Sequence, residues 1–159
     1  MELIRYVKTQ IDQEIDTIDL RDYKVPIYGI DHENTHGIPK GTQQLNEKIS
    51  AYDHLIISVN EHNGSASVFF KNHIDWLSRN DRNFLDDKKI FLLSTSPGRG
   101  AANMALTYAV ELLSRFGAEI VSRFSLASFD HSYSAEKGIY DEEQKRDFEN
   151  ALKTFTDNI

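Results

Sequence analysis

Two short polar loops carry the residues best suited to chemistry. Asn-Glu-His-Asn-Gly-Ser at 60–65 follows the apolar run 54–59, and Ser-Pro-Gly-Arg-Gly at 96–100 follows the apolar run 88–95. After each loop, apolar residues recur at helical spacing. In an open parallel sheet such loops lie at the carboxyl edge of the strands, where ligands usually bind.

The residue types in these loops favour a flat ligand with polar edges, held by main-chain groups. Asn63 and Gly64 tolerate positive φ, and Ser65 can cap a helix that starts at Ala66. Glycines in the second loop leave room for a ring face. The same residue types also occur in ordinary strand–helix turns, so spacing alone leaves both interpretations open. The candidate binding residues are Asn60, Glu61, His62, Asn63, Gly64, Ser65, Ser96, Pro97, Gly98, Arg99 and Gly100.

The elements that must position the loops alternate between strand and helix, which predicts parallel strands joined by right-handed crossovers. We expect one α/β domain over residues 1–159, with an open, doubly wound sheet. Residues 22–39 are expected to form a loop and 129–139 an exposed connection. Expected helices cover 3–11, 40–50, 66–77, 105–116 and 141–156, and expected strands cover 15–20, 54–59, 88–95 and 118–126.

Composition excludes several classes of function. The chain has no cysteine, which rules out disulfides, thiolate catalysis and cysteine-ligated metals. Its net charge of −7 argues against general nucleic-acid binding, which needs a basic surface. No apolar run reaches the about 18 residues of a membrane span, and the charged N-terminus is unlike a signal peptide. We therefore expect a cytoplasmic protein that binds neither nucleic acid nor membrane.

The literal motifs resemble those of the NAD(P)H-dependent FMN reductase family, a flavodoxin-like group that includes quinone, azo-dye and chromate reductases. The family pattern reads Pro-Glu-Tyr-Asn-Gly-Ser, then Leu-Lys-Asn-x-Ile-Asp-Trp-Leu-Ser-Arg. Here Asn60 replaces the proline and His62 the tyrosine. The run 94–100 is similar to the family's second flavin loop. The matching residues of the first pattern are Glu61, Asn63, Gly64, Ser65, Lys71, Asn72, Ile74, Asp75, Trp76, Leu77, Ser78 and Arg79.

The resemblance implies a flavodoxin-like sheet of order 2-1-3-4-5 with FMN at its carboxyl edge. Residues 60–65 would contact the isoalloxazine ring, and residues 96–100 would border it. The implied activity is hydride transfer from NADPH or NADH to the flavin, then reduction of a small-molecule acceptor such as a quinone or free flavin. No side chain needs to act as a catalytic acid or nucleophile. A homodimer or homotetramer is implied as well.

One family feature has no counterpart in this sequence. Members begin with a strand and a loop resembling Gly-Ser-x-Arg-x-x-Ser-x-Asn, which holds the FMN phosphate, whereas residues 1–11 match the helix after that loop. Without that strand, a gap of about 10 Å would separate strand 15–20 from strand 54–59.

Three explanations of the missing strand compete. In the first, the true start of the protein lies upstream of Met1, or a segment of the sequence is omitted. In the second, a rearrangement or a strand from another chain fills the gap in the sheet. In the third, the protein is a degenerate family member that no longer binds FMN. The last would make it a non-catalytic interaction module. A one-electron carrier of the flavodoxin type fits the motifs less well.

Several other residues have a functional and a plain interpretation. His62 could meet the flavin edge, and Arg99 could face reduced flavin or a nucleotide phosphate; either could also be solvated. His73 is expected to pack inside the protein or to line an interface between subunits. The same two roles are expected for Trp76. The histidine and acidic residues of 31–36 match no zinc pattern, so a polar loop is expected there and no metal site.

Overall fold

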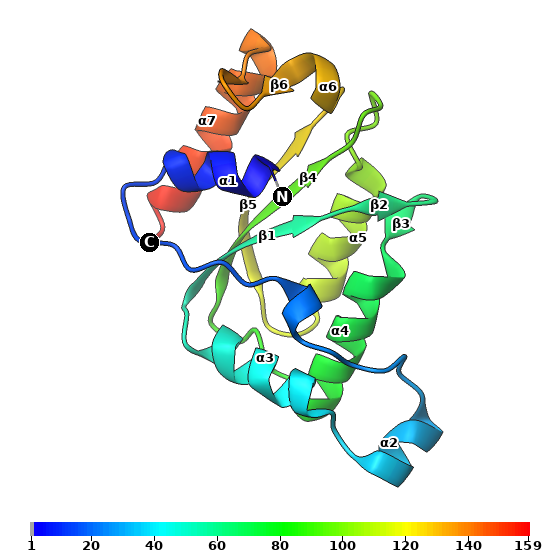
Figure 1. Ribbon diagram of the computed structural model, residues 1–159. Coiled ribbons are helices and arrows are strands. Elements are labelled where there is room, and N and C mark those ends of the chain that lie inside the picture. Colours follow the sequence, from blue (N-terminus) through cyan, green and yellow to red (C-terminus); the bar gives the residue numbers. More distant parts are fainter. Residues whose placement is uncertain (1) are drawn as a thin grey trace.

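A three-stranded parallel sheet forms the centre of the computed structural model, which describes residues 2–159 (Figure 1). Met1, part of the expected domain, lies outside the described residues. The sheet has the order β1-β4-β5, from β1 (His54–Val59), β4 (Lys89–Thr95) and β5 (Glu119–Leu126). The central strand β4 is fully buried from Ile90 to Leu93, as expected for an apolar run covered on both faces.

Helices cover both faces of this sheet, so the fold is an α/β fold with a doubly wound parallel sheet, as predicted. One face packs against α4 (Val68–Asn80) and α5 (Asn103–Ser114), with α3 (Lys40–Ser50) beside α4. The other face packs against α1 (Glu2–Thr9) and α7 (Glu142–Thr156). Alternation along β4 divides its side chains between the two cores, with Ile90 and Leu92 on the first side and Phe91 and Leu93 on the second.

Local signals set several of the expected boundaries. Gly117, after α5, has a φ of +97°, and a Cβ there would lie 1.9 Å from Asp86 Oδ1, so only glycine fits. Asp141 caps α7, because its carboxylate accepts a hydrogen bond of 3.0 Å from Gln144 N. Within residues 2–159, no helix is both long and apolar enough to traverse a bilayer.

The expected strand at residues 15–20 does not form. The chain there is extended without secondary structure and ends in a single 3-10 turn, η1 (Leu20–Asp22). Within the described chain, no main-chain hydrogen bond involves residues 13–18. The apolar pattern is present, yet the segment has no neighbouring strand with which to pair.

Two expected connections contain regular structure. Residues 22–39 include α2 (Ile30–His36), although the sequence there suggested only a loop. Residues 129–139 form α6 (Phe129–Ser132) and a small hairpin of β6 (Tyr133–Ser134) and β7 (Gly138–Ile139). Ser132 and Ile139 are buried, so this connection is not an exposed loop. Contacts with α1 and α7 stabilise it, and these could not be read from local composition.

Candidate functional site

The two predicted loops lie side by side at the carboxyl edge of the sheet. Val59, the last residue of β1, stands opposite Ser94 of β4 in the parallel register. The first loop therefore leaves its strand next to the point where the second loop leaves β4. The predicted juxtaposition of residues 60–65 and 96–100 is present in the fold.

The first loop is a small hairpin rather than a simple turn into a helix. It consists of β2 (Glu61–His62) and β3 (Ser65–Ala66), with Asn63 and Gly64 at φ of 52° and 76° between them. Two residues of positive φ are typical of the mirror-image turns in two-residue hairpins, for which Asn-Gly is the strongest signal.

The expected helix cap was wrong by two residues. Ser65 pairs with His62 in the hairpin, while α4 begins at Val68. Ser67 is the cap, accepting a hydrogen bond of 3.2 Å from Phe70 N. Closing the hairpin requires residues 65–66 as a strand, so the helix starts later than its apolar periodicity suggested.

Glu61 joins the hairpin to the helix that follows the second loop. Its Oε2 accepts hydrogen bonds from Met104 N at 3.1 Å and Ala105 N at 3.2 Å. Ala102 at the N-cap position of α5 provides no side-chain cap, so the carboxylate of Glu61 takes that role from a distant part of the sequence. Met104 also lies beside the hairpin, because a Cβ on Gly64 would meet its Cε at 3.2 Å. Glu61 therefore positions both loops.

Two serines beneath the second loop fix its main chain. The hydroxyls of Ser94 and Ser125 each donate to the carbonyl oxygen of Ala101 at 2.9 Å. Ala101 and Ala102 both have positive φ, 55° and 59°, which costs about 1–2 kcal/mol for each residue that is not glycine. The surrounding contacts must hold the loop in this conformation. The role of these two serines was not predicted from the sequence. The only sequence signal is that each of two adjacent apolar strands, β4 and β5, carries a hydroxyl side chain near its end.

The upper surface of the second loop is open. A Cβ on Gly98 would approach only Ser96 Oγ, at 3.9 Å, and one on Gly100 would have no atom within 4 Å. Pro97 and Arg99 are exposed in the same loop. Across from it, His62 is exposed, and its Nε2 lies 2.9 Å from Asn60 Nδ2. Exposed polar residues of both loops, including His62 and Arg99, thus lie near the open main chain at Gly98 and Gly100.

The rest of the α4 motif anchors a distant segment rather than contributing to this surface. Asn72 Nδ2 and Trp76 Nε1 donate to Pro26 O at 2.9 and 2.8 Å, and Tyr28 N donates to Asn72 Oδ1 at 2.8 Å. Trp76 is fully buried, which settles its expected role as packing within the chain. His73 is also buried, with its ring nitrogens 2.8 and 2.9 Å from the carbonyl oxygens of Phe69 and Tyr23, and the expected packing role is confirmed.

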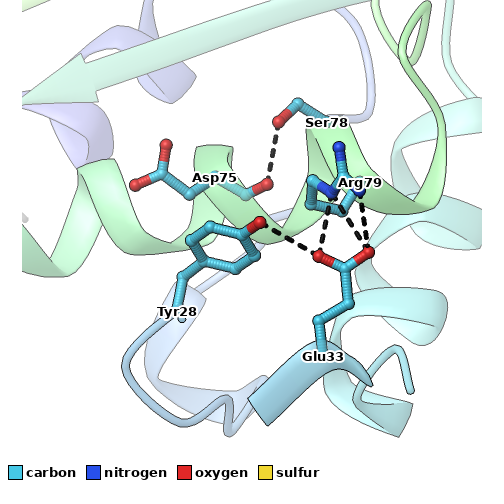
Figure 2. Close-up of polar contacts among 5 residues, drawn as sticks. All are labelled: Tyr28, Glu33, Asp75, Ser78 and Arg79. Atoms are coloured by element: carbon cyan, nitrogen blue, oxygen red, sulfur yellow. Dashed lines mark hydrogen bonds and ion pairs between the residues drawn. The ribbon is translucent and has the colours of Figure 1, made fainter. Parts of the chain in front are cut away.

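Glu33 ties α2 to the end of α4, as Figure 2 shows. Its carboxylate accepts hydrogen bonds of 2.9–3.1 Å from Arg79 Nε and 3.0 Å from Tyr28 OH. The hydrogen bonds from Arg79 lower the pKa of the Glu33 carboxyl group. The pKa of the Tyr28 hydroxyl is raised, mainly by burial and secondly by its hydrogen bond to Glu33. No three histidine or acidic side chains in residues 2–159 are arranged to bind a metal. Within 31–36, Glu33 thus makes a structural contact between α2 and α4, and the expected polar loop is a helix instead.

The family of the chain follows from comparison with known proteins. The family model for NADPH-dependent FMN reductase matches residues 2–132. An uncharacterized protein of Mycoplasma pneumoniae, the MG342 homolog, is 32% identical over 69% of this chain and 65% of its own length. Quinone reductase of Escherichia coli is 34% identical over 46% of this chain and 39% of its own length. The chain thus spans less than two thirds of these curated relatives.

A solved structure agrees with the sequence comparisons. FerB of Paracoccus denitrificans, a flavoenzyme NAD(P)H:(acceptor) oxidoreductase, superposes with a TM-score of 0.75 at 23% identity, over 98% of this chain and 86% of FerB. At this identity the similarity shows the fold alone. Together with the family match over residues 2–132, it leads to one conclusion: the chain belongs to the NADPH-dependent FMN reductase family.

Proposed function

We propose that the protein is an FMN-dependent NAD(P)H oxidoreductase that reduces a small-molecule acceptor such as a quinone. The observation that carries the proposal is the pairing of the two loops at one sheet edge, with Glu61 bound to the start of α5. Family membership and the quinone reductase relative support it. When bound, FMN would accept hydride from the nicotinamide and pass electrons onward.

The residues present fit the ring of FMN. The Asn63–Gly64 turn and the Ser96–Gly100 loop offer main-chain N–H groups, and the open space above Gly98 and Gly100 leaves room for a flat ring. His62 and Arg99 are exposed at the borders and would meet the ring edge or the nicotinamide nucleotide. We assign these residues to binding and orientation, and none to acid–base catalysis. We further propose a cytoplasmic enzyme that acts as a homodimer or homotetramer and uses NADPH or NADH.

Gly98→Val tests the placement of the ring. Because the space beside Gly98 is open, the side chain should leave folding intact and occupy the volume that the ring needs. FMN fluorescence quenching should show saturable binding to the original protein and at least tenfold weaker binding to the variant, a change of about 1.4 kcal/mol. Gly29→Val is the matched control, since a Cβ on Gly29 has no atom within 4 Å and Gly29 precedes α2, away from the two loops.

The outcomes separate the proposed oxidoreductase from the alternative. Equal FMN affinity in Gly98→Val and the original protein would refute the ring placement. A folded original protein without saturable FMN binding would refute the oxidoreductase and support a non-catalytic interaction module. Turnover of NADPH or NADH with a quinone then tests the activity itself.

A further inference from the structure

A third loop at the carboxyl edge of the sheet joins the candidate flavin surface to α7. This third loop, residues 127–132, follows β5 and includes the short helix α6. Leu126, the last residue of β5, stands opposite Thr95 at the end of β4 in the parallel register. The third loop therefore leaves the sheet next to the second loop, residues 96–100, and Figure 1 shows α6 at the end toward which β5 points.

Main-chain hydrogen bonds fasten the third loop to the second. Ser128 N donates to Gly98 O at 3.0 Å, and Phe129 N donates to Ser96 O at 3.0 Å. Ser128 has a φ of 49° and a ψ of 50°, a left-handed conformation that is unfavourable for residues other than glycine. The contacts on both sides of Ser128 must therefore hold the third loop in this shape.

These hydrogen bonds set the direction of one peptide group in the second loop. The carbonyl of Gly98 accepts from Ser128 N and so faces the third loop. The peptide between Gly98 and Arg99 is planar and trans, so its N–H points away from its carbonyl. The N–H of Arg99 is therefore directed away from the third loop, and it donates to no other main-chain group within residues 2–159. It is available to an acceptor atom of a ligand.

The side chain of Gln144 on α7 holds both ends of the third loop. Its Oε1 accepts a hydrogen bond of 2.7 Å from Ala127 N, and its Nε2 donates to Ser132 Oγ at 2.9 Å. Ala127 N can only donate, so the atom that faces it must be the amide oxygen, and the orientation of the amide follows. Asp141 caps the same turn of α7 by accepting from Gln144 N, which fixes the point from which the side chain extends.

Gln144 lies outside the part of the chain that the family model matches. That match covers residues 2–132 and ends before α7. The candidate binding residues lie in the first and second loops, and the hydrogen bonds of Gln144 reach them only through the third loop. Both polar atoms of its amide are engaged by that loop, so its contacts suit a holding role rather than contact with a ligand.

We propose that Gln144 is a positioning residue of the candidate site. Through the third loop it fixes the peptide between Gly98 and Arg99, and so directs the N–H of Arg99 toward the flavin surface. This inference rests on the proposed function, because it takes FMN as the ligand of that surface. It adds α7, which packs on the opposite face of the sheet from α4 and α5, to the elements that shape the site.

Hydrogen exchange without ligand tests the connection between the loops. Gln144→Leu keeps roughly the volume of the side chain and removes both hydrogen bonds. The amides of Ser128 and Phe129 should exchange at least about tenfold faster in this variant, because the third loop loses its attachment to α7. Arg146→Leu, at an exposed position of the same helix, is the matched control and should exchange as the original protein does. Equal exchange in both variants, or an equal acceleration at the buried amides 90–93 of β4, would overturn the role of Gln144.

FMN affinity, measured well below the melting temperature, tests the effect on the site. Fluorescence quenching should show about fivefold weaker binding by Gln144→Leu, as expected for the loss of roughly one hydrogen bond to the ligand, and unchanged binding by Arg146→Leu. Gln144→Glu should restore the affinity, because a carboxylate still accepts from Ala127 N and can accept from the hydroxyl of Ser132. A merely structural role would lower the melting temperature of Gln144→Leu without changing its FMN affinity, and that result would overturn the proposal. Equal losses of affinity in Gln144→Glu and Gln144→Leu would do the same.

The two measurements separate this inference from the proposed function. An original protein without saturable FMN binding would overturn the proposed function, and the exchange of Ser128 and Phe129, which needs no FMN, would still decide whether Gln144 holds the loops together. Saturable binding that Gln144→Leu leaves unchanged would overturn the positioning role alone.

Discussion

The contact of Glu61 with the start of α5 gives the sharpest test of how the candidate site is held together. Its Oε2 accepts hydrogen bonds from Met104 N and Ala105 N, and among residues 2–159 no other side chain caps the start of this helix. Glu61→Ala removes the acceptor and the negative charge at the positive end of the helix dipole. Loss of a helix cap costs about 0.5–2 kcal/mol, and hydrogen bonds to charged groups contribute about 1.5–3 kcal/mol.

Because Glu61 is half-buried, we expect a loss of about 1–2 kcal/mol in the free energy of unfolding. For a chain of this size each kcal/mol shifts the melting temperature by about 2–4 °C, so Glu61→Ala should melt about 2–8 °C lower. Glu61→Gln keeps an acceptor oxygen and loses only the charge, so its melting temperature should fall between those of the other two proteins. Differential scanning calorimetry without ligand measures both variants.

The matched control is Glu111→Ala, which removes an exposed carboxylate from the same helix, away from its start. It should change the free energy of unfolding by less than about 0.5 kcal/mol. If Glu61→Ala melts within about 1 °C of the original protein, or no lower than Glu111→Ala, then Glu61 does not hold the loops together. A lower melting temperature for Glu61→Gln than for Glu61→Ala would also refute the capping argument.

Contacts of α4 and of the second loop give further measurable outcomes. Asn72→Ala should lower the free energy of unfolding by about 1–3 kcal/mol in urea titration, because it removes two hydrogen bonds and leaves Tyr28 N without its partner, while Pro26 O keeps the bond from Trp76 Nε1; a loss below about 0.5 kcal/mol would contradict this role. The lowered pKa of Glu33 means that its contribution to stability is present above about pH 4.5 and is lost as the pH falls through the lower folded value. Glu33→Gln should therefore flatten the acid side of the stability profile, and an unchanged profile would count against the Arg79 contact. If Arg99 meets the extra phosphate of NADPH, Arg99→Leu should raise KM for NADPH about fivefold and leave KM for NADH nearly unchanged, as expected for an exposed ion pair of about 1 kcal/mol; equal effects on both would exclude that role.

The parts of the fold that could be predicted are those in which local pattern and burial agree. The apolar runs of β1, β4 and β5, the turn at Gly117 after α5 and the start of α7 at Asp141 were predictable because each signal lies within a few residues of the element it sets. The Asn63–Gly64 turn was also predictable, although the hairpin around it was missed. Asn-Gly allows a hairpin, yet two pairs of strand residues are too few to show an alternating pattern.

The interactions that hold the candidate site depend on residues far apart in the sequence. Glu61 binds the start of α5 over a separation of more than 40 residues, and Ser94 and Ser125 meet at one carbonyl oxygen from two strands. Nothing local distinguishes a capping glutamate from a solvated one. The motif comparison predicts Glu61 as a ligand contact, which stays a prediction, and gives no sign that its carboxylate accepts hydrogen bonds from main-chain N–H groups of α5.

The failure of residues 15–20 to form a strand has a physical cause that also applies to the unpaired edge of β1 within residues 2–159. An apolar pattern selects the face that a segment buries, but a strand exists only when a neighbour accepts and donates its main-chain hydrogen bonds. Ile15 and Ile18 are half-buried, as the pattern requires, while the main chain from 13 to 18 has no such neighbour. A cavity of about 780 Å³ is lined by both this segment and β1, and within residues 2–159 β1 pairs with β4 alone. Half-burial of the apolar side chains and hydrogen bonding of the main chain are therefore separate outcomes, and the apolar pattern of residues 15–20 encodes only the first.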